Sequence, residues 1–324
     1  MNISKNWIRF SLIICLVIAC SYGVGRLYYL ITDGFLISNI TYDHPYDAKW
    51  ETRSLDSAEL AEVKSILDQK FTYLGKGCQS YAFLSADGKY VIKFLKYQRY
   101  FPQQWLEHFS FIPWVEAYRL DKITRKKEKL ESLYHCWKLA FNELQTETAL
   151  VYMHINKTNH LFGNTVFADK MGFEHSLALD RYEFLIQKRA DMLQPSLEKM
   201  VASKQMTEAK ELIDKLFVLL LSEYKRGLAD NDHALIQNTG ILEGNPIHID
   251  VGQFVRNQRV KEPEVYFQEI FSKTYKFRDW LKEISPELES YVQEKLRLLI
   301  GESYAKMQPY MNKAAIGALS TEEF

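Results

Sequence analysis

The stretch HALIQNTGILEGNPIHIDVGQF, residues 233–254, contains two short apolar runs that flank a Glu-Gly-Asn-Pro turn. This pattern predicts a β-hairpin, because turn residues between two apolar runs are typical of paired strands. Asn238 precedes the first run and Asp250 follows the second, twelve positions later. A hairpin that folds back on itself would bring both side chains to one edge. Amide and carboxylate oxygens at one edge suit Mg²⁺, which takes few ligands from a protein.

The composition is that of a globular protein. The 324 residues can bury a sizeable core, and 47% of them are apolar and 25% charged. The 41 Lys and Arg residues balance 41 Asp and Glu residues, which argues against a nucleic-acid partner because such binders need a basic face. The four cysteines show no CxxC or His spacing, which argues against a zinc module and a disulfide scaffold.

Residues 1–34 predict a membrane segment. The apolar run from Phe10 to Gly25 has 16 residues, fewer than the roughly 20 that cross a bilayer, but the following LYYLI extends it if Arg26 snorkels. A single-pass signal anchor is our first interpretation. A lipoprotein signal ending at Cys20 is the next, and a cleaved signal peptide or a buried helix remains open. The small charge difference across the segment leaves the side of the membrane open.

Behind that segment, the sequence predicts alternating helices and strands. The expected order is a tether and lead-in helix at 35–66, two strands around a turn in 71–96, a mostly helical stretch from 97 to about 155, two strands in 175–190, one long helix in 197–227, the hairpin, and two or more helices to the end. Gly227 is expected to end the long helix, since helices commonly end at a glycine in the left-handed conformation.

Two surface features have two interpretations each. The aromatic residues between Tyr100 and Trp114 are most simply explained as core packing, with a membrane or partner surface as the alternative. The basic run from Lys122 to Lys129 is most simply a solvated helix face, and contact with anionic lipid is its alternative.

Several short motifs follow one another in a characteristic order. They are Gly75-x-Gly77-x-x-Ser80, Lys93 in VIKF, a Glu-bearing helix, Asp232, Asn238 and Asp250 in DVG. This order resembles that of the protein-kinase-like superfamily, which includes protein kinases and aminoglycoside kinases, and it covers roughly residues 68–260. The resemblance implies a two-lobed α+β fold. Its small antiparallel-sheet lobe would span 67–190 with a helical insertion at about 95–130, and its mostly helical lobe would span 191–324.

The resemblance implies a nucleotide site for Mg-ATP, built from the first motifs. Gly75 and Gly77 would let backbone amides approach the phosphates, with Ser80 in place of a third glycine. Lys93 would bind the α- and β-phosphates as the strand lysine of the family. Gln187, in a segment that resembles the strand leading into the hinge, would lie near the adenine.

The resemblance also implies a metal site and a base. Asp250 would hold Mg²⁺, and Asp232, 18 residues earlier, would orient or deprotonate the acceptor hydroxyl. The family places its metal-binding Asn five residues after that Asp, where this chain has Gln237. We assign the role to Asn238, which directly precedes the apolar strand. Asp230 is a rival for the base because HRD is missing.

The carboxylate that pairs with Lys93 is the least clear of these residues. Counting back from a segment that resembles the loop before the fourth strand points to Glu147. Glu143, one turn earlier on the same expected helical face, is the second choice.

The expected function is therefore that of a membrane-tethered atypical kinase. It would transfer the γ-phosphoryl group of ATP to a hydroxyl of a protein or small molecule. About 70 residues follow DVG and no APE occurs among them, which disfavours a protein kinase with a full activation segment. The missing HRD and the shifted Asn leave an inactive pseudokinase, acting as a nucleotide-binding or scaffolding module, as the alternative.

Overall fold

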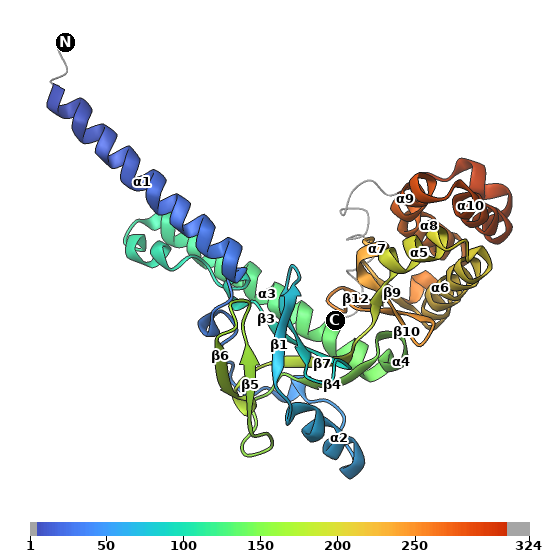
Figure 1. Cartoon of the computed structure of the whole chain (residues 1–324), viewed down its shortest axis with the longest axis horizontal. Helices are drawn as coiled ribbons and strands as arrows, with labels where there is room; N and C mark the ends of the chain where they lie inside the picture. Colours follow the sequence, from blue (N-terminus) through green and yellow to red (C-terminus); the bar gives the residue numbers. More distant parts are fainter. Residues whose placement is uncertain (1–4, 310–324) are drawn as a thin grey trace. The chain divides into compact units, whose positions relative to one another are not determined.

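The computed structural model describes residues 5–309 (Figure 1). The chain is α+β, as expected, and it forms two compact units. The first contains the described residues up to Tyr46 together with Leu55–Phe101 and Asn156–Phe184, and the second contains Asp47–Ser54, Pro102–Ile155 and the described residues from Leu185 onward. Residues 102–155 thus group with the C-terminal part of the chain, whereas the sequence placed them in the first lobe. The kinase-like arrangement of two lobes stays a prediction.

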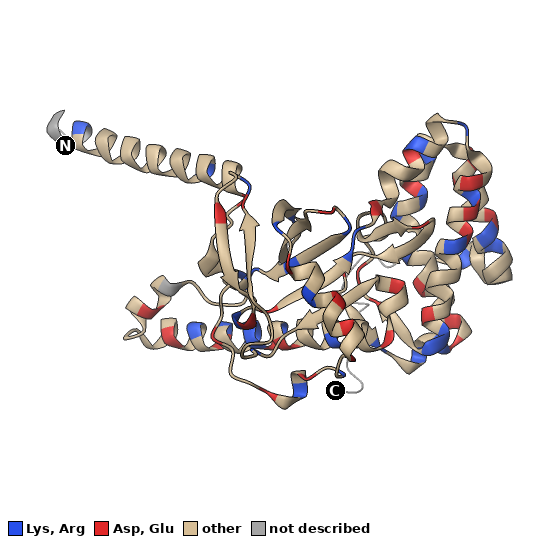
Figure 2. Ribbon diagram, turned by 60° about the horizontal axis from the view of Figure 1, so that its bottom comes forward, with Lys and Arg blue, Asp and Glu red and all other residues tan. Residues whose placement is uncertain are grey.

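An apolar helix begins the described chain. Helix α1 (Lys5–Thr32) runs through Arg26 without interruption, so the apolar segment is longer than the 16-residue run. Its part from Arg9 to Thr32 has 24 residues and a mean hydropathy of 1.9, which is long and apolar enough to cross a membrane by length and composition. Figure 2 shows α1 free of charged residues over nearly all of its length. A signal sequence meets the same criteria. Residues 1–4, which contribute to the expected charge difference, lie outside the described residues.

The first unit is built on a sheet. Its strands are β1 (Phe71–Lys76), β2 (Ser80–Ser85), β3 (Tyr90–Leu95), β5 (Asn164–Ala168) and β6 (Glu174–Ala178), in the order β3-β2-β1-β5-β6. The β1–β5 pair is parallel, and the other pairs are antiparallel. Phe167 is at the centre of the core, with its ring 5.1–5.4 Å from the rings of Phe71, Phe83 and Phe94. Residues with buried side chains alternate with more accessible ones along β2, as a sheet with one buried face requires.

Apart from α1, the helices of the first unit are short. Besides α1 they are α2 (Ser57–Leu67) and the 3₁₀ turns η1 (Ile37–Asn39), η3 (Tyr97–Arg99) and η5 (Leu179–Arg181). The expected helix α2 begins with a capping box: Asp56 accepts from the Glu59 backbone N–H, and the Glu59 side chain accepts from that of Asp56. The expected turn between β2 and β3 is also present, with the Gly88 N–H donating to the Ser85 carbonyl at 2.9 Å.

The second unit is mostly helical and contains three small groups of strands. Its helices are α3 (Pro113–Glu143), α4 (Gln145–Thr148), α5 (Leu193–Ala202), α6 (Met206–Arg226), α7 (Leu235–Asn238), α8 (Pro263–Lys273), α9 (Tyr275–Ile284) and α10 (Pro286–Ile300), with 3₁₀ turns η2 (Ala48–Trp50), η4 (Gln104–Phe109), η6 (Gln258–Lys261) and η7 (Gly301–Lys306). Its strands are β4 (Leu150–His154), β8 (Asp191–Met192), β9 (Leu228–Asp230), β10 (Thr239–Leu242), β11 (Asn245–His248) and β12 (Phe254–Arg256). Strand β7 (Phe184–Lys188) belongs to this unit from Leu185 onward. Residues 310–324, the end of the expected C-terminal lobe, lie outside the described residues.

The core of the second unit forms around α6. Leu212, Leu216 and Leu220 recur every four residues, which places them on one face of the helix. All three are buried in one cluster with Val292 and Leu296 of α10. This packing gives the strands that follow α6 a rigid support.

Two expectations about helix ends need correction. The predicted single helix in 197–227 is two helices, α5 and α6, because the chain turns at Ser203–Gln205, where Lys204 has a φ of +58°. The stretch from 97 to 155 ends in strand β4 and not in helix, after Ala149 at a φ of +51°. Gly227 does end α6 as predicted, with a φ of +76°.

Glu143 and Glu147 do not share a continuous helical face. Glu143 is the last residue of α3, and Glu147 lies in the separate short helix α4. Leu144 interrupts the helix between them with φ −128° and ψ 27°. The two carboxylates, four residues apart, therefore do not lie one turn apart on a single helix as we expected.

Candidate nucleotide and metal site

The predicted hairpin is present. Strands β10 and β11 pair antiparallel, and Glu243 and Gly244 connect them with φ values of +52° and +74°. Two successive positive φ angles are typical of the type I′ turn, whose twist matches that of paired strands. The Ile249 N–H donates to the Asn238 carbonyl at 2.8 Å. Because Asp250 follows Ile249 directly, Asn238 and Asp250 belong to the same end of the hairpin.

A second pair of strands connects the loop that carries Asp232 with the loop that carries Asp250. Strand β9 pairs antiparallel with β12, and the Asn231 N–H donates to the Gln253 carbonyl at 3.1 Å. The Gln253 amide also donates to Asp232 Oδ2 at 3.3 Å. The loop that carries Asp232 and the loop that carries Asp250 are therefore joined at both ends.

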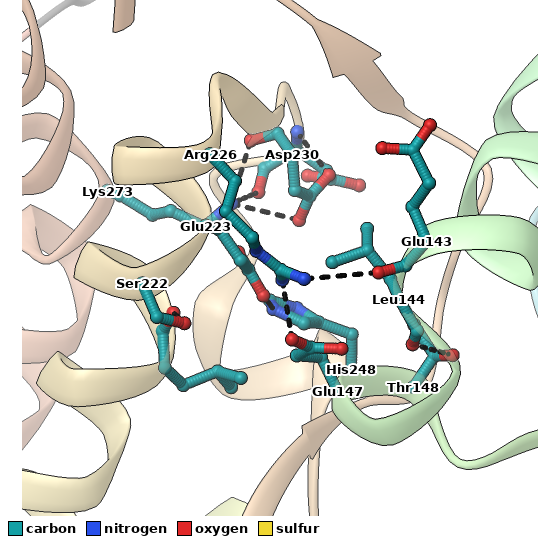
Figure 3. Close-up of polar contacts among 12 residues, drawn as sticks. Glu143, Leu144, Glu147, Thr148, Ser222, Glu223, Arg226, Asp230, His248 and Lys273 are labelled. Carbon is teal, nitrogen blue, oxygen red and sulfur yellow. Dashed lines mark hydrogen bonds and ion pairs between the residues drawn. The ribbon is translucent and has the colours of Figure 1, made fainter. Parts of the chain in front are cut away.

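Asp230 and Asp232 have different environments. Asp230 is 3% exposed and forms an ion pair of 2.9 Å with Lys273 Nζ, which is buried as well (Figure 3). The ammonium also donates to the backbone carbonyls of Asp230 at 2.7 Å and Asp232 at 3.1 Å. Asp232 is partly exposed, and its Oδ1 accepts from the Ala234 N–H at 3.0 Å. Asp230 thus has a structural role, and Asp232 is the more accessible carboxylate.

The two candidate amides also differ. Gln237 is exposed, whereas Asn238 is partly buried at the base of the hairpin. The buried Nδ2 atom of Asn238 has no hydrogen-bond partner within residues 5–309. Asn238 and not Gln237 therefore lies partly buried at the end of the hairpin that carries Asp250, and its role in binding a metal stays a prediction.

Asp250 is held in a turn and lies near a buried thiol. Its Oδ1 accepts from the Gly252 N–H at 3.0 Å. Burial above all, together with the negative charges of Asp230 and Asp250, raises the pKa of Cys136 in α3 to about 12.

The donor set fits Mg²⁺ only together with phosphate or water. Over residues 5–309, no three His, Cys, Asp or Glu side chains gather as a metal site. Asn238 and Asp250 supply one amide and one carboxylate, and Mg²⁺ is usually held by one or two carboxylates together with substrate phosphates.

In the first unit, Gly75, Ala82 and Lys93 form a row across three strands. Gly75 pairs with Ala82 between β1 and β2, and Ala82 pairs with Lys93 between β2 and β3. Directly opposed residues of antiparallel strands project from the same face. A Cβ atom built on Gly75 would meet nothing within 4 Å. The row is thus a shelf of small residues with a lysine at its end.

The glycine turn beside this shelf is held by two basic residues that the sequence analysis missed. The Gly77 N–H donates to the Ser80 carbonyl at 2.9 Å, which closes the turn. Lys96 Nζ donates to the Gly77 carbonyl at 2.5 Å, and Arg99 Nη1 to the Cys78 carbonyl at 2.6 Å. Burial lowers the pKa of Lys96 to about 8. Their place just after the VIKF strand is the one signal in the sequence that could have pointed to them.

The candidate partners of Lys93 both have arginine partners in the second unit. Arg226 Nη2 lies 2.5 Å from Glu147 Oε1, and Arg226 Nη1 donates to the Glu143 carbonyl at 3.2 Å (Figure 3). Arg256 forms an ion pair with the Glu143 carboxylate. The pairing of Lys93 with either glutamate stays a prediction.

Gln187 is buried, and its side chain is engaged. Its amide donates to the carbonyls of Thr148 at 2.5 Å and His248 at 2.9 Å. His248 in turn lies with Nε2 at 2.7 Å from Glu223 Oε1, and both side chains are inaccessible to solvent. The sequence analysis did not single out this buried pair, because neither residue shows a ligand spacing.

The comparisons with known proteins found similar solved structures but no matching family model or curated protein. No family model matches the chain, and no curated protein matches it. Similar solved structures include monomeric WbdD, at 13% identity and a TM-score of 0.33, covering 69% of this chain and 45% of WbdD. WbdD with the kinase inhibitor LY294002 shows 16% identity and a TM-score of 0.33, with coverages of 75% and 48%. A structure of "the bifunctional kinase- methyltransferase WbdD" shows 16% identity and a TM-score of 0.32, with coverages of 74% and 46%.

The chain therefore spans somewhat less than half of each of these WbdD chains.

Proposed function

We propose that the protein is an ATP- and Mg²⁺-dependent kinase, tethered to a membrane by α1, that phosphorylates a hydroxyl acceptor. The observation that carries this proposal is the hairpin, which brings Asn238 and Asp250 to one end beside the loop of Asp232. Phosphoryl transfer requires mainly positioning and charge neutralisation, and a carboxylate, an amide oxygen and a second, accessible carboxylate are suited to that task.

Each residue has one role in this proposal. Asp250 and Asn238 bind the Mg²⁺ ion that neutralises the phosphates, and Asp232 orients the acceptor hydroxyl and takes its proton. The shelf of Gly75 and Ala82 leaves room for the nucleotide, and Lys93 supplies a positive charge for its phosphates. Lys273 does not touch the substrate, but its contacts with the backbone carbonyls position the loop of Asp232.

The test compares the wild type with Asp250→Ala and Asp232→Ala. We expect Mg-ATP to raise the thermal unfolding midpoint of the wild type, and Asp250→Ala to abolish that shift. Loss of a general base typically lowers the rate by about 10²–10⁴-fold, so Asp232→Ala should lower transfer of labelled γ-phosphoryl by that factor while binding persists. The exposed Asp279→Ala is the matched control. No Mg-ATP shift in the wild type, or equal transfer in all variants, would contradict the proposal.

The pseudokinase remains a second candidate because of one observation. Glu147 is bound to Arg226, which occupies the carboxylate that an active kinase would need for its strand lysine. In that case, the protein binds ATP without transferring phosphate, and Asp232→Ala leaves every measured property unchanged.

A further inference from the structure

The segment that leads into α3 exposes a cluster of large aromatic side chains. We call this cluster the aromatic surface; its members and their exposed fractions are Trp105 (58%), Phe109 (45%), Phe111 (77%), Trp114 (74%) and Tyr118 (47%). The rings of Trp105 and Phe109 are 6.1 Å apart, and those of Phe109 and Phe111 are 6.4 Å apart. Three of these aromatic rings are thus contiguous on the surface. The expectation that the aromatic residues between Tyr100 and Trp114 serve core packing is wrong for Trp105, Phe109, Phe111 and Trp114.

The segment already has a buried side of its own. Leu106 is 3% exposed and Val115 is 6% exposed, so apolar side chains of η4 and of the first turn of α3 anchor the segment. The aromatic surface is therefore a second, outward-facing side. An exposed apolar cluster of this kind marks an interaction site, whereas scattered single apolar residues do not.

The next turns of α3 are basic. The run from Lys122 to Lys129 contains five Lys or Arg residues and one acidic residue, Glu128. Lys122 Nζ lies 5.2 Å from the centre of the Tyr118 ring, so the basic run begins beside the aromatic surface. The charge of this run is complementary to that of anionic lipid headgroups, which attract basic segments close to the membrane surface.

We propose that the aromatic surface and the basic run together bind the interface of a membrane that contains anionic lipids. Tryptophan and tyrosine concentrate at the boundary between water and hydrocarbon, where the ring is apolar and its polar group stays hydrated. A basic flank beside apolar residues is the usual composition of such interfacial segments. The helix α1 of the same chain is long and apolar enough to cross a bilayer by length and composition. The proposal concerns a surface outside the candidate site and does not depend on kinase activity.

The experiment measures backbone hydrogen exchange in the full chain, reconstituted into vesicles of phosphatidylcholine alone or mixed with phosphatidylglycerol. We expect amides of residues 104–122 to exchange several-fold more slowly in the mixed vesicles. The variant Trp105→Ser/Phe111→Ser/Trp114→Ser should lose this protection, and Lys126→Gln/Lys127→Gln/Lys129→Gln should lose its dependence on phosphatidylglycerol. Quenching of tryptophan fluorescence by brominated lipid should fall in the first variant.

The control variant is Leu298→Ser, because Leu298 is 78% exposed in α10 and lies outside the aromatic surface. It should behave as the wild type does. Equal exchange of residues 104–122 in the two kinds of vesicle would overturn the proposal. Protection that rises with protein concentration and is independent of lipid would overturn it too, and would identify a second copy of the chain as the occupant. Thermal unfolding of each variant checks that it is folded, and exchange within α1 reports on the tether separately.

Discussion

Lys273 and Asp230 show how single residues hold the candidate site. The ammonium and the carboxylate are 1% and 3% exposed, and the ammonium also contacts two backbone carbonyls of the following loop. Removing one partner of a buried ion pair leaves the other charge without compensation, which typically costs about 3–5 kcal/mol. Through the Lys273 ammonium, the pair is joined to the backbone of the loop that carries Asp232.

We predict that Lys273→Ala lowers the free energy of unfolding by about 3–5 kcal/mol, because it leaves the Asp230 carboxylate buried and unpaired. Urea unfolding followed by circular dichroism measures the change. Lys276→Ala, at an exposed position of α9, is the control and should stay within about 0.5 kcal/mol of the wild type. A small effect of Lys273→Ala would show that the pair is not needed to hold the loop.

Glu183 makes the stability of the first unit dependent on pH. Burial raises the pKa of Glu183 to about 7, and the nearby Tyr97 hydroxyl offsets this only in part. The ordinary pKa is about 4.3. The folded state therefore binds the proton more tightly than the unfolded state, and stability falls as pH rises from about 4 through 7.

The expected size of this loss is on the order of 3 kcal/mol. Glu183→Gln should remove it and make the protein more stable than the wild type at pH values above the raised pKa. Unfolding midpoints measured across this pH range provide the test, with Glu62→Gln at an exposed position as control. An unchanged pH profile in Glu183→Gln would contradict the raised pKa.

At the scale of elements, the hairpin depends on close packing at its first strand. Gly240 pairs with Ile247 of β11 and with Met192 of β8, so its strand is central in a three-stranded sheet. A Cβ atom at this position would lie 2.7 Å from Ala190 Cβ and 2.8 Å from Ile249 Cγ2. Only a residue without a side chain fits there, and Ile249 directly precedes Asp250.

Gly240→Ala should therefore destabilise the protein by about 1–3 kcal/mol, the usual cost of overpacking, and it should weaken Mg-ATP binding through a shift of Asp250. Calorimetric titration with Mg-ATP and urea unfolding measure the two effects. Gly163→Ala serves as control because a Cβ atom there would meet nothing within 4 Å. Unchanged stability in Gly240→Ala would contradict the prediction, because it would show that the neighbours of β10 accommodate a methyl group without loss of unfolding free energy.

At the scale of the whole molecule, α1 gives the chain a membrane-spanning candidate that is independent of the two compact units' cores. The charge-poor stretch from Arg9 to Ile31 is exposed in the structure, and insertion into a bilayer would remove its apolar side chains from water.

We predict that the full chain stays in the membrane fraction after alkaline carbonate extraction. Val17→Lys with Ile18→Arg should release it, because each charge at the centre of a spanning helix costs about 2.5–3.5 kcal/mol on insertion. Tyr46→Lys, at an exposed position outside α1, is the control. Complete extraction of the wild type would exclude α1 as an anchor.

The sequence by itself determined those elements whose signals are local. The capped helix α2, the turn before Gly88, the end of α6 at Gly227 and the β10–β11 hairpin were all predictable. Each depends on the spacing of apolar residues and on turn or capping residues within a few positions. The place of Asn238 and Asp250 at one end of the hairpin follows from the same local signals.

Only the tertiary structure decided which charges are paired. Asp230 meets Lys273 43 residues later, and Glu147 meets Arg226 79 residues later. No local pattern specifies such partners, because they depend on how distant helices pack. The same holds for the aromatic residues before α3, whose spacing did not reveal which side faces the core. Burial and ion pairing are therefore the properties that distinguish Asp232 from Asp230, and they arise only when the chain folds.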